Sequence, residues 1–179
     1  MARLHKRAEL KDSLALHNLA LKHGFGGLGL PVDQKKCVDL LREAADLGCL
    51  AAQYQLGNFH KNGNMGLEQN EKEIRICFEK AAKGGHVYAW HNLGCSEHRH
   101  ENDVAATRDF RLSASGGLRM SMVNLIKRFE IGWLHHGDLA KTLQAYYRSR
   151  AEMKSKDRDQ YIEHLKRTGE YKEEYGLYS

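Results

Sequence analysis

Apolar residues recur at helical spacing in residues 71–83, where they occupy positions 74, 77, 78, 81 and 82. Intervals of three or four residues place side chains on one face of an α-helix. The pattern predicts a helix over 71–83, and we predict a partner helix over about 51–61. Glycines 63 and 66 lie between the two stretches, as expected of a turn. These elements form a helix–turn–helix unit whose apolar face needs a neighbour to pack against.

The same unit recurs along the chain at a fixed interval. The runs "EAADLG" and "CLAAQYQLG" (residues 43–57) are matched 37 residues later by "KAAKGG" and "HVYAWHNLG" (residues 80–94). The same interval leads from Ala52 back to Ala15, so an earlier copy precedes these two. Self-similarity with a fixed period of this length predicts a solenoid, in which each unit buries its apolar face against the next.

A shorter interval follows the second copy. Gly117 and Leu125 lie 32 residues after Gly85 and Leu93, and we expect the five missing residues to come from the linker inside the third unit. Surface linkers tolerate such deletions. The sequence therefore predicts an all-α, right-handed α-solenoid over residues 8–137, with units at about 12–48, 49–85 and 86–117 and a partial unit at 118–137.

Glycine recurs inside the first helix of two units, at Gly57 and Gly94. A glycine within a helix costs about 1 kcal/mol relative to alanine, so its recurrence needs a reason. We expect a neighbouring backbone to cross at these two positions. A leucine at position 94 should then unfold the array.

The C-terminal segment has helical apolar spacing but no repeat anchors. We predict capping helices over residues 138–168, because terminal repeats need a polar outer face. Asp138 and Ser155 are candidate N-caps for two separate helices. Residues 169–179 are expected to fray.

Composition narrows the function classes only slightly. The chain has 28 Lys and Arg against 23 Asp and Glu, and these charges are dispersed, which does not favour nucleic-acid binding. It has no apolar run of membrane-spanning length and no signal-peptide core, so no membrane association is expected. The four cysteines do not recur at equivalent repeat positions, which favours a reduced, intracellular and cytoplasmic protein.

The set of anchors resembles the Sel-one-like repeat (SLR), a relative of the tetratricopeptide helical solenoids. In the second unit the resemblance rests on Ala52, Leu56, Gly57, Gly63, Gly66, Phe78, Ala81, Ala82 and Gly85. It covers roughly residues 8–160, and the stretch 84–95 with the shortened third unit resembles a branch common in algal protists such as diatoms. The resemblance implies a non-catalytic scaffold or adaptor that binds a partner protein or peptide.

By analogy with related solenoids, the first helix of each unit lines the concave face. Inward positions on these helices supply aromatic, amide and cationic side chains, which suit a peptide carrying acidic groups. The candidate partner-binding residues are His17, Tyr54, Asn58, Lys61, Tyr88, His91, Cys95, His98, Arg99 and Lys127.

Two other functions remain open. One is the repeat portion of a larger adaptor, such as a RING-type ubiquitin-ligase-associated protein, although this sequence contains no C-x-x-C pair. The other is a metal-binding or thiol enzyme, because His91, Cys95 and His98 share a helix face. Eleven histidines make such coincidences common, so we expect no metal, no cofactor and no catalytic residue.

Overall fold

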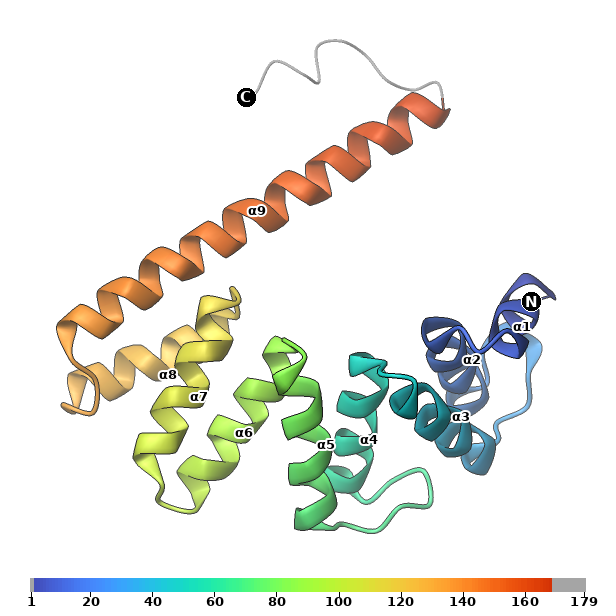
Figure 1. Cartoon of the computed structure of the whole chain (residues 1–179), viewed down its shortest axis with the longest axis horizontal. Helices are drawn as coiled ribbons and strands as arrows, with labels where there is room; N and C mark the ends of the chain where they lie inside the picture. Colours follow the sequence, from blue (N-terminus) through green and yellow to red (C-terminus); the bar gives the residue numbers. More distant parts are fainter. Residues whose placement is uncertain (1, 169–179) are drawn as a thin grey trace.

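The computed structural model describes residues 2–168, and that range is helical apart from short connections. The described part of the chain contains nine α-helices and one 3-10 turn, and Figure 1 shows how the helices are arranged. Their bounds are α1 Ala2–Glu9, α2 Ser13–Phe25, η1 Gly27–Gly29, α3 Gln34–Asp46, α4 Leu50–Asn62, α5 Glu71–Lys83, α6 Val87–Arg99, α7 Asp103–Ser115, α8 Arg119–Glu130 and α9 His136–Thr168.

The helices pair and stack in chain order, which confirms the predicted α-solenoid. Helices α2 and α3, α4 and α5, and α6 and α7 form three successive pairs, and α8 with the start of α9 forms a fourth (Figure 1). Helix α1 packs against α2 at the N-terminal end. Each pair therefore contacts only its neighbours, as expected of a repeat array.

The second helix of each full unit begins at an equivalent capping residue. Asp33 accepts a hydrogen bond from the backbone N–H of Lys36 at 2.9 Å. Asn70, 37 residues later, and Asn102, a further 32 residues on, cap α5 and α7 in the same way. A side-chain oxygen at this position satisfies a backbone donor that the helix leaves unpaired. These caps fix where each second helix starts.

The shortened interval arises in the third unit, as predicted. The connection between α4 and α5 runs over residues 63–70, whereas that between α6 and α7 covers only residues 100–102. The difference is eight minus three residues, which equals the five that the register lacks. The helices themselves keep their lengths, so the stacking surfaces are preserved.

Glycine recurs at positions 57 and 94 for a different reason from the one predicted. A Cβ atom on Gly57 would lie 2.6 Å from the Phe78 ring, and one on Gly94 would lie 2.9 Å from the Phe110 ring. The close neighbour is therefore an aromatic side chain of the unit's second helix, not a crossing backbone. Phe78 and Phe110 are both 2% exposed, so both rings belong to the core of the array.

Three apolar clusters follow one another along the array. Alanines at the tightest positions are fully buried, including Ala52, Ala81 and Ala89. The third cluster joins α7 and α8 to the start of α9. Small residues let helices approach closely, which brings neighbouring first helices together and positions their exposed faces as one surface.

The C-terminal segment is one helix and not the two predicted. Helix α9 continues through Ser155 without a break. Its first turns pack on α7 and α8 through Leu139, Leu143 and Tyr146, and its remainder extends beyond them (Figure 1). The expected fraying of residues 169–179 lies outside the described residues.

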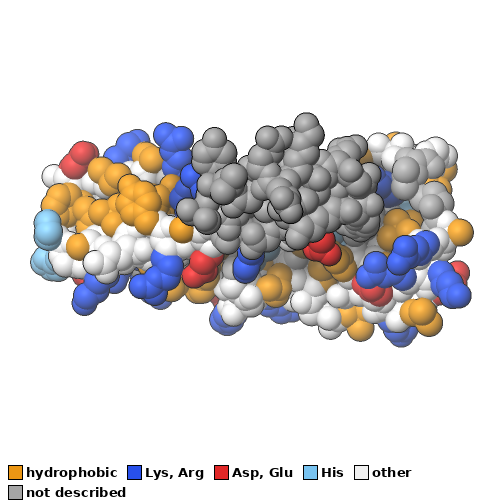
Figure 2. All heavy atoms as spheres, turned by 90° about the horizontal axis from the view of Figure 1, so that it is seen from above, with side chains coloured by type: hydrophobic (Ala, Val, Ile, Leu, Met, Phe, Trp, Pro, Cys, Tyr) orange, Lys and Arg blue, Asp and Glu red, His pale blue; other side chains and the backbone are white. Residues whose placement is uncertain are grey.

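The dispersed charge of the sequence is visible on the surface. Figure 2 shows Lys and Arg side chains scattered along the length of one face, among apolar and acidic groups. No described helix combines the length and the hydrophobicity needed to cross a lipid bilayer.

Candidate functional site

A cavity of about 440 Å³ opens where the first helices of the third and fourth units meet. Phe110 and Arg128 are buried at its base, whereas Arg99, Lys127 and Ile131 are exposed at its rim. The complete lining comes from α6, α7 and α8 and comprises Cys95, His98, Arg99, Asp103, Phe110, Asn124, Lys127, Arg128 and Ile131. Four of the predicted site residues, Cys95, His98, Arg99 and Lys127, are thus brought together from two units.

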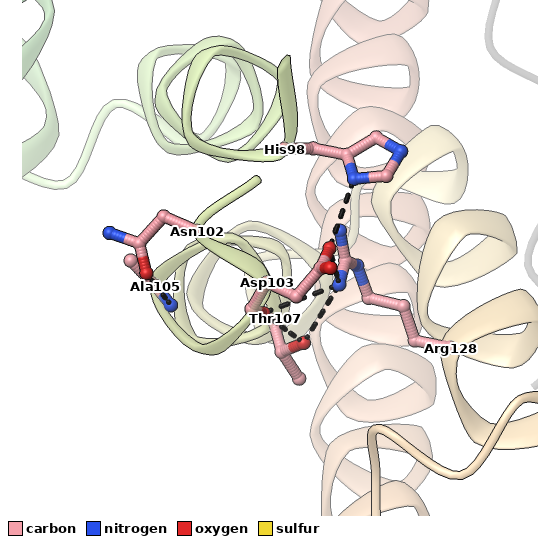
Figure 3. A network of polar contacts seen from close by, with 6 residues as sticks. All are labelled: His98, Asn102, Asp103, Ala105, Thr107 and Arg128. Carbon is pink, nitrogen blue, oxygen red and sulfur yellow. Dashed lines mark hydrogen bonds and ion pairs between the residues drawn. The ribbon is translucent and has the colours of Figure 1, made fainter. Parts of the chain in front are cut away.

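A polar network holds one wall of this cavity (Figure 3). The Asp103 carboxylate accepts hydrogen bonds from Arg128 Nη1 at 2.8 Å and from His98 Nδ1 at 3.0 Å. Arg128 also donates to Thr107 Oγ1 at 3.3 Å, and its guanidinium lies 5.4 Å from the centre of the Phe110 ring. The hydrogen bond from Arg128, followed by that from His98, lowers the pKa of Asp103. The positive charge of Arg128 is therefore balanced by Asp103, and its side chain forms part of the cavity wall.

The rim cations have no such partner. Neither Arg99 nor Lys127 forms an ion pair with any described residue, and both side chains are exposed. Charges in this state are available to an incoming acidic group, with which they can form charge-assisted hydrogen bonds.

A second hollow of about 410 Å³ adjoins the first. It lies between the ends of α4 and α6 and shares Arg99 with the cavity, while Lys61 and Asn62 line its other side. Lys61, Arg99 and Lys127 thus come from the first helices of three successive units. Glu71 is the one acidic residue in the lining of this hollow.

Several of the other predicted residues make contacts between units. Tyr54 stacks on His86 with ring centres 4.3 Å apart and lies 6.3 Å from the Tyr88 ring. The side-chain amide of Asn92 donates to Asn58 at 3.4 Å. His17 lies in the first unit and does not line the cavity; burial lowers its pKa. These contacts join α4 to α6, so they shape the surface on which the cations lie.

The predicted trio of His91, Cys95 and His98 is divided. His91 contacts Ser121 and Cys95, whereas His98 turns to Asp103. Burial, followed by the charge of Lys61, lowers the pKa of His91. In the part of the chain that the structure describes, no group of three or more His, Cys, Asp or Glu side chains could hold a metal ion.

Sequence reasoning missed the base of the cavity. The repeat pattern could have indicated Phe110, because this residue lies 32 residues after Phe78 in the same register. No feature of the sequence indicates the contact between Asp103 and Arg128. The other units have no equivalent pair, and the contact depends on how α7 and α8 cross.

Comparison with known families gives a match over the first part of the chain. The Sel1 repeat family model matches residues 13–49 and 50–86. The first two predicted units are therefore similar to Sel1 repeats. Each matched segment begins one residue after the bound predicted from the register, and the cavity lies in the two later, more divergent units.

A fungal protein is similar in sequence to part of the chain. Over 81 residues, the chain is 36% identical to chitin synthase regulatory factor 2 of Schizosaccharomyces pombe. The match covers 45% of this chain but only 16% of that protein. The chain therefore corresponds to a small part of its curated relative.

Solved Sel1 repeat structures share the fold. A Sel1 repeat protein of Oxalobacter formigenes superposes with a TM-score of 0.70 at 19% identity, covering 81% of this chain and 61% of that one. The c5321 antigen of uropathogenic Escherichia coli, described as an SLR fold, gives 0.67 at 23% identity, covering 80% and 32%. These relatives are fungal and bacterial, so they give no support to the resemblance with an algal branch.

Proposed function

We propose that this chain is a non-catalytic scaffold whose first helices bind a partner peptide that combines acidic groups with an apolar side chain. The apolar side chain would enter the cavity lined by Phe110 and Ile131. The acidic groups would lie along Lys61, Arg99 and Lys127. This assignment comprises the predicted partner-binding residues that line the two hollows and adds Phe110, Asn124 and Ile131.

One observation carries the proposal: Arg99 lines both hollows, so the two form one continuous surface across three units. An extended or helical peptide can follow such a surface, which is how solenoids use their stacked faces. Apolar pockets with a few polar groups at the rim give such sites both affinity and orientation.

The relatives support a regulatory role over a catalytic one. The fission-yeast protein that is similar to part of the chain is named a regulatory factor of chitin synthase, and we infer that this chain acts by binding and not by chemistry. All four cysteines are free thiols, which supports the expected intracellular, cytoplasmic location.

A displayed peptide library selected on the immobilised chain tests the proposal. We expect enriched peptides to carry Asp or Glu next to Leu, Ile or Phe. Their affinity should fall at least about tenfold in the double variant Arg99→Glu/Lys127→Glu, because charge reversal at two contacts costs more than about 1.4 kcal/mol.

The matched control is Lys83→Glu/Arg119→Glu, which makes the same charge change at exposed positions outside both hollows. Control affinity should equal that of the wild type. If peptides bind both double variants equally, or if no acidic peptides are enriched, the groove is not the binding surface.

A further inference from the structure

A chain of hydrogen bonds runs from the backbone of α6 through α7 and α8 and back to α6. The Ser113 hydroxyl donates to the Val87 carbonyl at 2.8 Å, and the Ser121 hydroxyl donates to Ser113 Oγ at 2.7 Å. His91 Nδ1 lies 2.8 Å from Ser121 Oγ, and His91 Nε2 lies 3.6 Å from the Cys95 sulfur. The chain ends at Cys95, which lines the 440 Å³ cavity.

The direction of this chain fixes the tautomer of His91. A carbonyl oxygen only accepts, so Ser113 uses its one proton on Val87 and must accept from Ser121. Ser121 has then used its own proton and can only accept from the imidazole. His91 therefore carries its proton on Nδ1, which leaves the Nε2 lone pair directed at the Cys95 thiol.

Both serines depart from the repeat pattern of this chain. Ser121 occupies the position of Ala15, Ala52 and Ala89 in the other units, and Ser113 that of Ala81. Both side chains are fully buried, where an alanine would pack equally well. Other units pack without these hydroxyls, and in this unit the two hydroxyls connect the Val87 carbonyl to His91.

The arrangement has the parts of an activated nucleophile: a thiol, a base within reach and a group that orients the base. Burial raises the pKa of the Cys95 thiol, and the charges of Lys61, Arg99 and Arg128 only partly oppose this shift. The resting group is therefore a thiol, and the unprotonated Nε2 of His91 lies 3.6 Å from its sulfur.

We propose that Cys95 and His91 form a covalent modification site for α,β-unsaturated carbonyl compounds that carry an acidic group. The thiol proton moves to His91 Nε2 as the sulfur bonds to the β-carbon of the electrophile. The π electrons of the carbon–carbon double bond pass to the enolate, which takes the proton back at the α-carbon. The product is a thioether, and His91 returns to its neutral form.

Turnover does not follow from this geometry. Cys95 lies inside α6, where backbone N–H groups are used in the helix, so no backbone donor faces the sulfur to stabilise an oxyanion. The electrophile stays attached. It would occupy the cavity, next to the cations Arg99 and Lys127 that favour its acidic group.

Labelling of the full native chain with N-ethylmaleimide, followed over time by peptide mass spectrometry, tests the site. Cys77 is the internal control, because it is also half-buried, also lines a hollow, and also has a pKa raised by burial, but it makes no hydrogen bond to an imidazole among the described contacts. We expect Cys95 to react at least about tenfold faster than Cys77, as general-base assistance predicts.

Two variants distinguish activation of Cys95 by His91 from a simple difference in the accessibility of the thiol. His91→Gln removes the base, and Ser113→Ala/Ser121→Ala removes the orienting hydroxyls while restoring residues that the other units carry at these positions. Each should lower the Cys95 rate about tenfold and leave the Cys77 rate and the helical circular dichroism unchanged. A maleimide bearing a carboxylate should widen the Cys95 advantage over Cys77.

Equal rates at the two cysteines, or a Cys95 rate that the double serine variant leaves unchanged, would overturn the proposal. If a carboxylated maleimide shows no added preference for Cys95 over Cys77, the inference that the electrophile carries an acidic group is wrong. The test needs no peptide partner, so its outcome is independent of the proposed scaffold function.

Discussion

At the scale of single residues, Arg128 links the stability of the array to the shape of the cavity. Its side chain is buried, and its charge is balanced by Asp103 and covered by the Phe110 ring. A buried cation that loses its partner is strongly destabilising, whereas replacing both members of a pair by apolar groups is often tolerated. The two members of this pair should therefore respond differently to substitution.

Asp103→Ala leaves Arg128 buried without its counter-ion, so we expect the melting temperature to fall by several degrees. Adding Arg128→Met to that variant removes the stranded charge and should recover at least half of the loss. Thermal unfolding of the wild type, both single variants and the double variant measures this coupling. Additive losses in the double variant would mean that the two side chains do not act as a pair.

Gly94 gives a second residue-scale prediction. A methyl group there would lie 2.9 Å from the Phe110 ring, so Gly94→Ala should destabilise by about 1–3 kcal/mol despite its better helix propensity. Gly94→Leu should unfold the array. Gly137→Ala is the matched control, because nothing lies within 4 Å of a Cβ at that helical position, and it should be neutral or stabilising by chemical denaturation. A stable Gly94→Ala protein would show that Phe110 can move.

At the scale of elements, the sequence predicted the features that several units share, but not those that occur at only one place in the chain. The bounds of α5, the shortened third linker and the solenoid itself follow from a register that several units share. Helix α9 has no second copy to compare with, so nothing in the pattern distinguished one long helix from two. The polar residue at position 155 is compatible with a cap or with a helix interior, and only packing decides between them.

The same distinction applies to the candidate site: some of its residues follow from the repeat register, and others do not. Arg99 and Lys127 were predicted because equivalent positions on stacked helices must lie on one face. The pairing of Asp103 with Arg128 depends on the crossing of α7 and α8, for which the sequence has no periodic signal. Tyr54 and His91 are also predicted partner-binding residues, yet the contacts of both side chains lie within the protein; a residue predicted on an inner face is not necessarily an exposed one.

At the scale of the whole molecule, histidines distributed over the array make its stability depend on pH. Burial lowers the pKa of His17 and His23 in the first unit and of His86 and His91 in the third unit. Ring nitrogens of His17, His23 and His86 are buried without a hydrogen-bond partner. The folded state therefore disfavours the charged form of each ring, and the first and third units lose stability when these histidines are protonated.

The sign follows from linkage. The folded pKa values lie below the ordinary value of about 6.5, so the unfolded chain binds more protons and stability falls as pH drops below about 6.5. Asp109 opposes this trend, because burial raises its pKa and folding then favours its protonated form. Asp12 and Asp103, whose pKa values are lowered by hydrogen bonds, lose their contribution only below about pH 4.

We therefore expect the midpoint of urea unfolding to be lower at pH 5.5 than at pH 7.5. The four histidines are the groups with lowered pKa values that titrate in this window, so replacing one should flatten the dependence. His86→Gln removes one titrating ring and leaves Asp109 in place, which isolates the histidine contribution. Equal midpoints at the two pH values in the wild type, or an equally steep dependence in His86→Gln, would show that these rings are protonated as readily in the folded chain as in the unfolded one.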